Sequence, residues 1–342
     1  LVFEVASATS TEARVKSNTD GKGLTYWCPT INMARDPRWG RAEENYGEDP
    51  FLTSKIAVSF IKGMQGNDPK YLKTVATAKH FACNNVEYNR YGISSDVDER
   101  NLREYYLPAF KASVVEGGVY SIMSAYNAVN GVPSPANRTL LLNILRNEWG
   151  FDGYVVSDCD AVKNVWDPHN YVGSAAEASA ISIANGNDLN CGSTFQESAG
   201  AAISSGILTE TELDSALFHL LRARFLLGEF DAPSSVPYRS VPDSLLDCRA
   251  HRELALRAAR ESIVLLKNEN SILPLTFDDI DTISIIGPNA AATQLGGYSG
   301  TPAVTVSILQ GIADRFGIDI SDGTIEAEWY TSQSGIQTES CD

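Results

Sequence analysis

Several short apolar runs of the sequence end at side chains that could do chemistry. Asp158 directly follows the run YVVS, Lys79 and His80 lie near the end of the run TVATAKHFA, and Tyr126 closes a third run. Each run has the length and composition of a buried β-strand. Because the reacting groups of a barrel lie at the carboxyl ends of its parallel strands, we expect these side chains to share one ring of loops.

Asp158 could have either of two roles in such a ring. A carboxylate at a strand end can be a nucleophile that attacks an electrophilic carbon. It can also cap the helix that follows, as strand-end aspartates often do, although Asp160 is the better placed of the two for that cap. The residue pattern leaves both roles open.

Lys79 also has several roles open to it. It could form a Schiff base with a carbonyl substrate, hold substrate hydroxyls, or pair with a carboxylate in an ordinary salt bridge. The loop after the first apolar run contains Trp39, Arg41, Glu43 and Glu44. Such a loop can be a solvated charged segment or a carbohydrate platform, since the faces of sugars stack on indole rings.

Together these groups favour a sugar as substrate. Charged side chains can hydrogen-bond several hydroxyls, and a carboxylate can lie beneath the anomeric carbon. A metal site is not expected, because the four histidines are far apart in the sequence and the six cysteines form no CxxC pair. No GxSxG motif is present, which disfavours a serine hydrolase.

The charge and hydropathy of the chain exclude other partners. The sequence has 27 Lys and Arg against 43 Asp and Glu, a formal net charge of −16 over 342 residues. This balance argues against nucleic acid and anionic membranes, which need an excess of cations. We also expect no membrane span, because no run of about 18 apolar residues occurs.

Predicted strands and helices alternate along the first part of the chain. The strand candidates are residues 24–33, 74–82, 119–126, 154–157 and 188–191. The helix candidates are residues 48–63, 98–116, 137–149, 174–185 and 209–227, the last with a capping box of Thr209 and Glu212. This alternation predicts a parallel sheet covered by helices. A (β/α)8 barrel fits it, and the alternative, a doubly wound sheet, lacks a GxGxxG loop.

We expect three regions. Residues 1–228 would form a catalytic (β/α)8-like barrel, truncated so that its first strands are missing, because the chain begins without Met in what is predicted as a helix. Residues 229–250, rich in Pro, Ser and Asp, would be a linker. Residues 251–342 would begin a C-terminal α/β domain, with a helix over 251–267 and a strand over 282–286.

Six motifs follow one another over nearly the whole chain. They are NMARDPRWGRAEENYGEDP at 32–50, AKHF at 78–81, SAYNAVNG at 124–131, YVVSDCDA at 154–161, DLNCG at 188–192 and ESIVLLKNENSILPL at 261–275. In this order they resemble glycoside hydrolase family 3. That family consists of retaining β-glycosidases in which a (β/α)8-like barrel is followed by an α/β sandwich domain, with the active site between the two.

The resemblance implies a role for each candidate residue. Asp158 falls on the family's nucleophile. The substrate-binding residues that it implies are Arg41, Lys79, His80, Tyr126 and Glu44, the last in a supporting role. His80 would donate a hydrogen bond to a hydroxyl. No cofactor or metal is implied, and the partner is an oligosaccharide or polysaccharide-derived substrate. The acid/base Glu of the family is expected beyond Asp342.

Two of the motifs resemble one branch of the family and so indicate a narrower class of substrate. SDC at the nucleophile and DxxCG on the next strand resemble β-xylosidases, whereas many β-glucosidases carry SDW. In that branch we expect Cys159 and Cys191 to meet at neighbouring strand ends, either bonded or unbonded, and to crowd the place of a hexose hydroxymethyl group. A β-glucosidase, a carbohydrate-binding relative without catalysis and a Lys79 aldolase remain alternatives. The acidity and the substrate favour an extracellular or periplasmic location.

Overall fold

The computed structural model describes residues 1–275, 283–296 and 298–317. The chain divides into two compact units, Leu1–Arg260 and Glu261–Asp342. The division falls within helix α9 (Arg249–Ser262), whereas the sequence predicted that the second domain begins at residue 251. None of the helices in the described ranges is long and apolar enough to cross a lipid bilayer.

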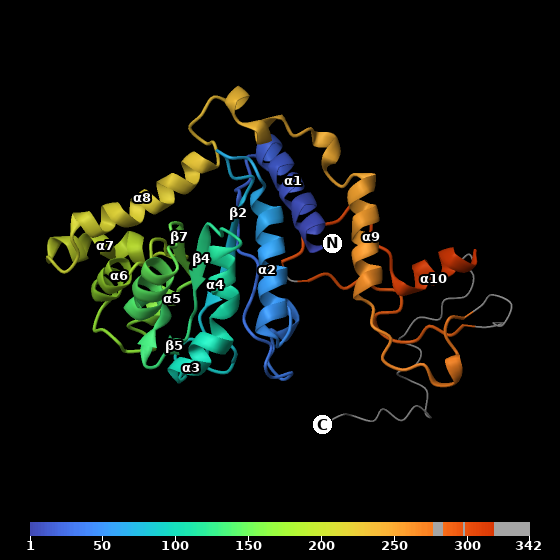
Figure 1. Ribbon diagram of the computed structural model, residues 1–342, viewed down its shortest axis with the longest axis horizontal. Helices are drawn as coiled ribbons and strands as arrows, with labels where there is room; N and C mark the ends of the chain where they lie inside the picture. Colours follow the sequence, from blue (N-terminus) through green and yellow to red (C-terminus); the bar gives the residue numbers. More distant parts are fainter. Residues whose placement is uncertain (276–282, 297, 318–342) are drawn as a thin grey trace. The chain divides into compact units, whose positions relative to one another are not determined.

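A parallel sheet forms the centre of the first unit (Figure 1). Its strands, in spatial order, are β1 (Thr25–Tyr26), β2 (Val75–Phe81), β4 (Ser121–Ser124) and β7 (Tyr154–Ser157). The segment around Leu189 pairs with β7 through an isolated parallel bridge to Val156. Spatial order therefore follows chain order, as in a (β/α) barrel, whereas a doubly wound sheet reverses its order at a switch point. The predicted barrel-like α/β class is confirmed.

The strands form because their residues are apolar or small on both faces. Every residue of β4 and β7 is buried, and so is every residue of β2 except Lys79. Strand β1 is shorter than the predicted 24–33, because Pro29 has no N–H to donate to a ladder. Pairing with β2 nevertheless continues beyond it, since the N–H of Ile31 donates to the Lys79 carbonyl at 2.8 Å.

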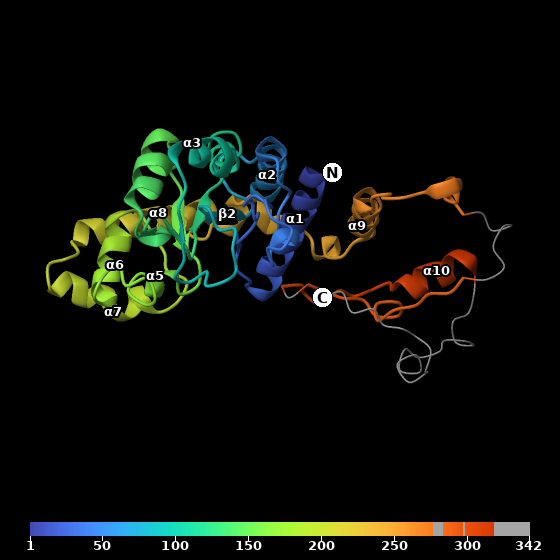
Figure 2. The ribbon, with the colours of Figure 1, turned by 90° about the horizontal axis from the view of Figure 1, so that it is seen from below.

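Helices follow the strands along the chain and pack beside one another (Figures 1 and 2). In the first unit they are α1 (Val2–Asp20), α2 (Pro50–Gln65), α3 (Glu99–Asn101), α4 (Pro108–Val115), α5 (Ala161–Asn164), α6 (Ala175–Ala184), α7 (Thr194–Ser204), α8 (Glu210–Leu226) and most of α9. Helices α2 and α4 pack on β2, and α8 packs on β7. The predicted capping box of Thr209 and Glu212 is confirmed at the start of α8.

Two helix predictions need correction, and one helix of the first unit was not predicted. The predicted helix over 98–116 is divided before Pro108, because a proline lacks the N–H that a continuous helix requires. The segment Thr139–Glu148 is π-helical rather than α-helical. Helix α7 has no counterpart among the predictions, since its run TFQESAGAAIS is mostly small or polar and shows little apolar periodicity.

A small second sheet borders the first at its carboxyl end. It contains β3 (Ser94–Ser95), β5 (Ala128–Val129) and β6 (Val132–Pro133), which were not predicted because each strand has only two residues. In the second unit, α10 (Ile308–Phe316) is capped by Ser307, whose hydroxyl accepts from the N–H of Gln310. The predicted strand over 282–286 is not formed in its described part, 283–286, and residue 282 lies outside the described residues.

Candidate active site

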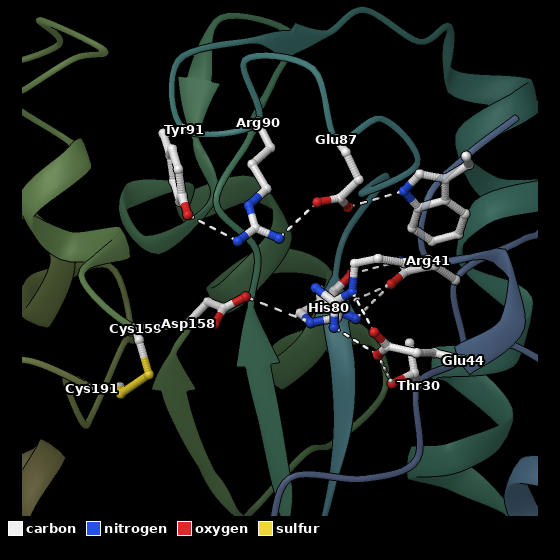
Figure 3. A network of polar contacts seen from close by, with 12 residues as sticks. Thr30, Arg41, Glu44, His80, Glu87, Arg90, Tyr91, Asp158, Cys159 and Cys191 are labelled. Atoms are coloured by element: carbon white, nitrogen blue, oxygen red, sulfur yellow. Dashed lines mark hydrogen bonds and ion pairs between the residues drawn. A yellow bond between two sulfur atoms is a disulfide. The ribbon is translucent and has the colours of Figure 1, made fainter. Parts of the chain in front are cut away.

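Side chains from the ends of β2 and β7 and from the loop after β1 converge on one cluster (Figure 3). Tyr126, from the end of β4, interacts with Asp158 in the same cluster. The cluster contains every site residue predicted from the sequence: Asp158, Arg41, Lys79, His80, Tyr126 and Glu44. They converge because the strands are parallel and adjacent, so their carboxyl ends meet at one edge of the sheet. Residues separated by more than a hundred positions in the chain thus act on one another directly.

The carboxyl group of Asp158 lies at the centre of the cluster. Its Oδ1 accepts the N–H of Cys159 at 2.8 Å, and its Oδ2 lies 3.5 Å from His80 Nε2. Oδ2 is buried and accepts no hydrogen bond from the described residues. The N-cap position of α5 belongs to Asp160, so the helix-cap role that the sequence left open does not fall to Asp158.

The protonation of Asp158 reflects opposing effects. Burial raises the pKa of the Asp158 carboxyl group, because the charged form loses its hydration. The N–H of Cys159, the Tyr126 side chain and the cations Lys79 and Arg41 oppose that rise. In return, burial and the Asp158 carboxylate raise the pKa of the Tyr126 hydroxyl, which stays protonated. Hydrogen bonds and nearby cations therefore both favour the charged form of Asp158 against its burial.

Arg41 and Glu44 form a two-point ion pair. Arg41 Nε and Nη2 donate to the two carboxylate oxygens of Glu44, each at 2.7 Å, within the 3₁₀ turn Ala42–Glu44. Thr30 Oγ1 also donates to Glu44, at 3.4 Å. The hydrogen bonds from Arg41 lower the pKa of Glu44. Glu44 is thus engaged by Arg41 and orients it, as bidentate pairing does in general.

Lys79 and His80 occupy the end of β2. Burial, and then the Arg41 cation, lower the pKa of the Lys79 ammonium, while the carboxylates of Glu44 and Asp158 favour its charged form. His80 is 1% exposed. Burial, with the cations around it, keeps the pKa of His80 well below its ordinary value, so the imidazole is neutral.

A second polar chain lies beside the cluster and was not predicted (Figure 3). Glu87 accepts the indole N–H of Trp39 at 3.1 Å and pairs with Arg90 at 2.7 Å. Arg90 donates to the Tyr91 hydroxyl at 2.9 Å and lies over the rings of Tyr91 and Tyr126, 4.9 Å from each. Glu87, Arg90 and Tyr91 belong to the loop after β2, which has no apolar periodicity, and the spacing of Glu87 and Arg90 was their one sequence signal.

The Trp39 platform, one of the two roles that the sequence left open for its loop, is not formed. Trp39 is 6% exposed, and its N–H is bound to Glu87. Its indole face is therefore not offered to solvent as a stacking surface. The sequence could not distinguish a buried tryptophan from an exposed one in a charged loop.

Cys159 and Cys191 form a disulfide with a Cα–Cα distance of 4.4 Å, which confirms that the two cysteines meet (Figure 3). The bond joins the residue after Asp158 to the segment that follows the Leu189 bridge. Two hydrogen bonds support it, from the Cys191 N–H to Ser157 Oγ and from the Asp160 N–H to the Cys191 carbonyl. The disulfide and these hydrogen bonds therefore restrain the backbone that follows Asp158.

The cluster is suited to polyol chemistry with a carboxylate nucleophile. It provides a buried carboxylate, two cations beside it, a neutral imidazole and a tyrosine hydroxyl. Cations keep such a carboxylate ionised, and the remaining groups can hydrogen-bond hydroxyls. Within residues 1–275, 283–296 and 298–317, no three side chains of the metal-ligating types gather into a possible site.

Comparison with known proteins identifies a family whose sequence models match most of this chain. The sequence model described as the glycosyl hydrolase family 3 N-terminal domain matches residues 5–223, and that of the family's C-terminal domain matches residues 263–338. A β-xylosidase/α-L-arabinofuranosidase from Medicago sativa subsp. varia is 41% identical over 322 residues, which are 91% of this chain and 42% of that protein. A xylan 1,4-β-xylosidase from Xylanibacter ruminicola is 41% identical over 328 residues, 91% of this chain and 38% of that protein.

Solved structures agree with these relatives. An exo-β-xylosidase of family 3, in complex with a xylobiose aziridine activity-based probe, is similar with a TM-score of 0.88 and 38% identity. The match covers 92% of this chain and 42% of that one. A β-glucosidase from Erythrobacter marinus is similar with a TM-score of 0.82 and 34% identity, over 93% of this chain and 42% of that one. The chain thus spans about two fifths of the length of these relatives.

Proposed function

We propose a function from one premise: this chain belongs to glycosyl hydrolase family 3. The protein that contains it is a retaining, exo-acting β-glycosidase that releases xylose from xylo-oligosaccharides. The observation that carries this proposal is the buried carboxylate of Asp158, whose Oδ2 has no donor among the described residues and which lies near Lys79 and Arg41.

The reaction proceeds by double displacement. Asp158 attacks the anomeric carbon, a glycosyl ester forms, and the bond to the leaving oxygen breaks as a second carboxyl group protonates it. That group, now a carboxylate, takes a proton from water, and the water oxygen displaces Asp158 from the anomeric carbon. Each displacement inverts the anomeric centre, so the product keeps the original configuration. The second carboxyl group is assigned to no residue of this chain.

The other residues of the cluster hold the substrate and the nucleophile. Lys79 and Arg41 keep Asp158 ionised and hydrogen-bond substrate hydroxyls. Glu44 orients Arg41 through its two hydrogen bonds, and Tyr126 lies beside the nucleophile. His80, whose Nε2 lies 3.5 Å from Asp158 Oδ2, hydrogen-bonds a substrate hydroxyl beside the nucleophile.

Xylose is the proposed sugar. Relatives named as β-xylosidases support it. The Cys159–Cys191 disulfide begins at the residue after Asp158, and we propose that it crowds the position of a hexose hydroxymethyl group. A β-glucosidase is the second candidate, because structures with that name share the fold at 34% identity. Comparing kcat/KM for aryl β-xyloside and aryl β-glucoside separates the two, and a higher value for the glucoside would favour the second.

We further propose that the protein acts outside the cytoplasm, in the extracellular space or the periplasm, where it degrades xylan-derived chains. The disulfide supports this location, since such bonds persist in oxidising compartments. The net charge of −16 is compatible with it.

A mechanism-based label tests the nucleophile in the full-length protein. A 2-deoxy-2-fluoro xyloside with a good leaving group should form a stable ester, and peptide mapping should locate it on Asp158. Asp158→Asn should lower kcat about 10⁴-fold or more, because the group that forms the covalent bond is lost. Asp160→Asn is the matched control, since Asp160 is exposed two positions away and should leave kcat nearly unchanged. A label on another residue would refute the proposal.

A further inference from the structure

The side chain of Asn32 continues the pairing between the segment after β1 and β2. Backbone pairing reaches Ile31, and Asn32 then takes over with its amide group. Its Oδ1 accepts the N–H of His80 at 2.8 Å, and its Nδ2 donates to the His80 carbonyl at 2.8 Å. Asn32 is 3% exposed, so this amide replaces a peptide group in a buried ladder and holds the backbone of His80 in place.

These two bonds determine which way the Asn32 amide points. A backbone N–H can only donate, so the atom that faces it must be the oxygen. A carbonyl can only accept, so the atom that faces it must be the nitrogen. The same Oδ1 lies 3.1 Å from Nδ1 of the His80 ring. Because an amide oxygen cannot donate, Nδ1 must carry the proton of this hydrogen bond.

The other ring nitrogen then has no proton when the ring is neutral. His80 Nε2 faces Asp158 Oδ2 at 3.5 Å, and Oδ2 accepts no hydrogen bond from the described residues. A lone pair therefore faces the carboxylate oxygen. Burial and the cations Arg41, Lys79 and Arg90, which favour the neutral ring by lowering the pKa of His80, are consistent with this arrangement.

We propose that Asn32 is a positioning residue that holds His80 as the Nδ1–H tautomer, so that His80 leaves the attacking oxygen of Asp158 free. In the other tautomer Nε2–H would donate to Oδ2, which would stabilise the carboxylate and weaken it as a nucleophile. The inference rests on the proposed function, since it takes Asp158 as the group that attacks. It also means that His80 accepts from a substrate hydroxyl, the reverse of the donation expected from the sequence.

The tautomer can be measured in the full-length protein with ¹⁵N-labelled histidine. Long-range ¹H–¹⁵N spectra distinguish a protonated ring nitrogen from an unprotonated one, and His80→Gln assigns the signals. We expect a protonated Nδ1 and an unprotonated Nε2 in the wild type. A proton on Nε2, in the neutral or the charged ring, would overturn the inference. This readout needs no substrate, so it stands even if xylosides are not hydrolysed.

Asn32→Ala tests the effect on Asp158. Without Oδ1 the ring can protonate Nε2 and donate to Asp158, so kcat should fall about tenfold, as a gain of one hydrogen bond in the ground state implies. The acid limb of the kcat profile should also move to lower pH. The other groups that face Asp158 (Tyr126, Lys79 and Arg41) are unchanged in this variant. A shift of the acid limb therefore reports the change in the hydrogen bond between the His80 ring and Asp158.

Asn185→Ala is the matched control. Like Asn32, Asn185 donates its side-chain amide to a backbone carbonyl, here that of Ala136 at 2.8 Å. Asn185 is half-buried and makes no hydrogen bond to His80. It should leave the ring signals and the pH profile as in the wild type. A lower kcat in Asn32→Ala without any displacement of the acid limb would assign Asn32 a structural role only and contradict the inference. If Asp158 is not labelled by the fluorosugar, the proposed function fails separately.

Discussion

Asp158 and Asp160 lie two positions apart, and their surroundings separate them. Asp158 is 9% exposed, its Oδ2 lies 3.5 Å from His80 Nε2, and cations flank it. Asp160 is exposed, adopts a φ of 62° at the N-cap of α5 and makes no cap bond through its side chain. A nucleophilic carboxylate needs a buried position with cations to keep it ionised, and only Asp158 has one.

The ion pair of Arg41 and Glu44 should stabilise the fold in a pH-dependent way. Glu44→Gln removes the charge, and we expect a decrease in Tm of about 1–3 °C at pH 7, in line with a partly exposed pair. Arg41 lowers the pKa of Glu44 below 4.5, so the stabilisation is complete above that pH and is lost as the pH falls through the lower pKa of the folded state. The Tm difference should therefore shrink on acidification.

Thermal unfolding of both proteins between neutral and acid pH measures this effect. Glu104→Gln is the control, because Glu104 pairs with Arg100 on the surface, where the two side chains are 65% and 82% exposed. Its Tm should match that of the wild type at every pH. A Tm difference for Glu44→Gln that grows as the pH falls would contradict a lowered pKa of Glu44 in the folded state.

Asn137 is the acceptor position of the glycosylation sequon Asn137-Arg138-Thr139, yet we expect it to remain unmodified. Its side chain is buried, with Oδ1 accepting the N–H of Leu140 at 3.1 Å. A glycan there would require the side chain to leave the core. Glycopeptide mapping of the protein from a secreting eukaryotic host should find Asn137 unmodified, and an occupied site would show that this packing is wrong.

At the scale of elements, the disulfide Cys159–Cys191 connects the end of β7 to the segment that pairs with β7 through the Leu189 bridge. It closes a loop with a sequence separation of 32 residues. Because such a crosslink restricts the unfolded chain, replacing both cysteines with serine should lower the free energy of unfolding by about 3 kcal/mol. Urea unfolding measures this change.

Cys248→Ser is the control for that experiment, because Cys248 is a free, half-buried cysteine. Its free energy of unfolding should stay within about 0.5 kcal/mol of the wild type. A double serine variant as stable as the wild type would mean that the disulfide does not constrain the chain. The elements on either side would then hold each other through packing alone.

For the whole molecule, the charge decides which partners are disfavoured. With a formal net charge of −16, the chain should repel polyanions at neutral pH. We expect no shift of a duplex DNA in an electrophoretic assay at low salt, where counterion release would favour binding most. A basic DNA-binding protein serves as the positive control. A shift that weakens with added salt would contradict the expectation.

The sequence by itself determined the class of fold and placed Asp158, Lys79 and Tyr126 at or near strand ends, while it left two roles open for Asp158. Local signals suffice for these, since apolar runs mark buried strands and the capping box of Thr209 and Glu212 marks the start of α8. Parallel strands then force their carboxyl ends together. The motif order added the family, and with it the expectation that Cys159 and Cys191 meet.

The tertiary structure alone decided how each side chain is used. Trp39 is buried against Glu87 instead of forming a platform, and Asn137 caps a helix inside the core. Asn32 reaches across 48 positions to His80 and determines which ring nitrogen holds the proton. The physical reason is that burial and hydrogen-bond direction depend on partners distant in the chain, whereas periodicity depends only on neighbours.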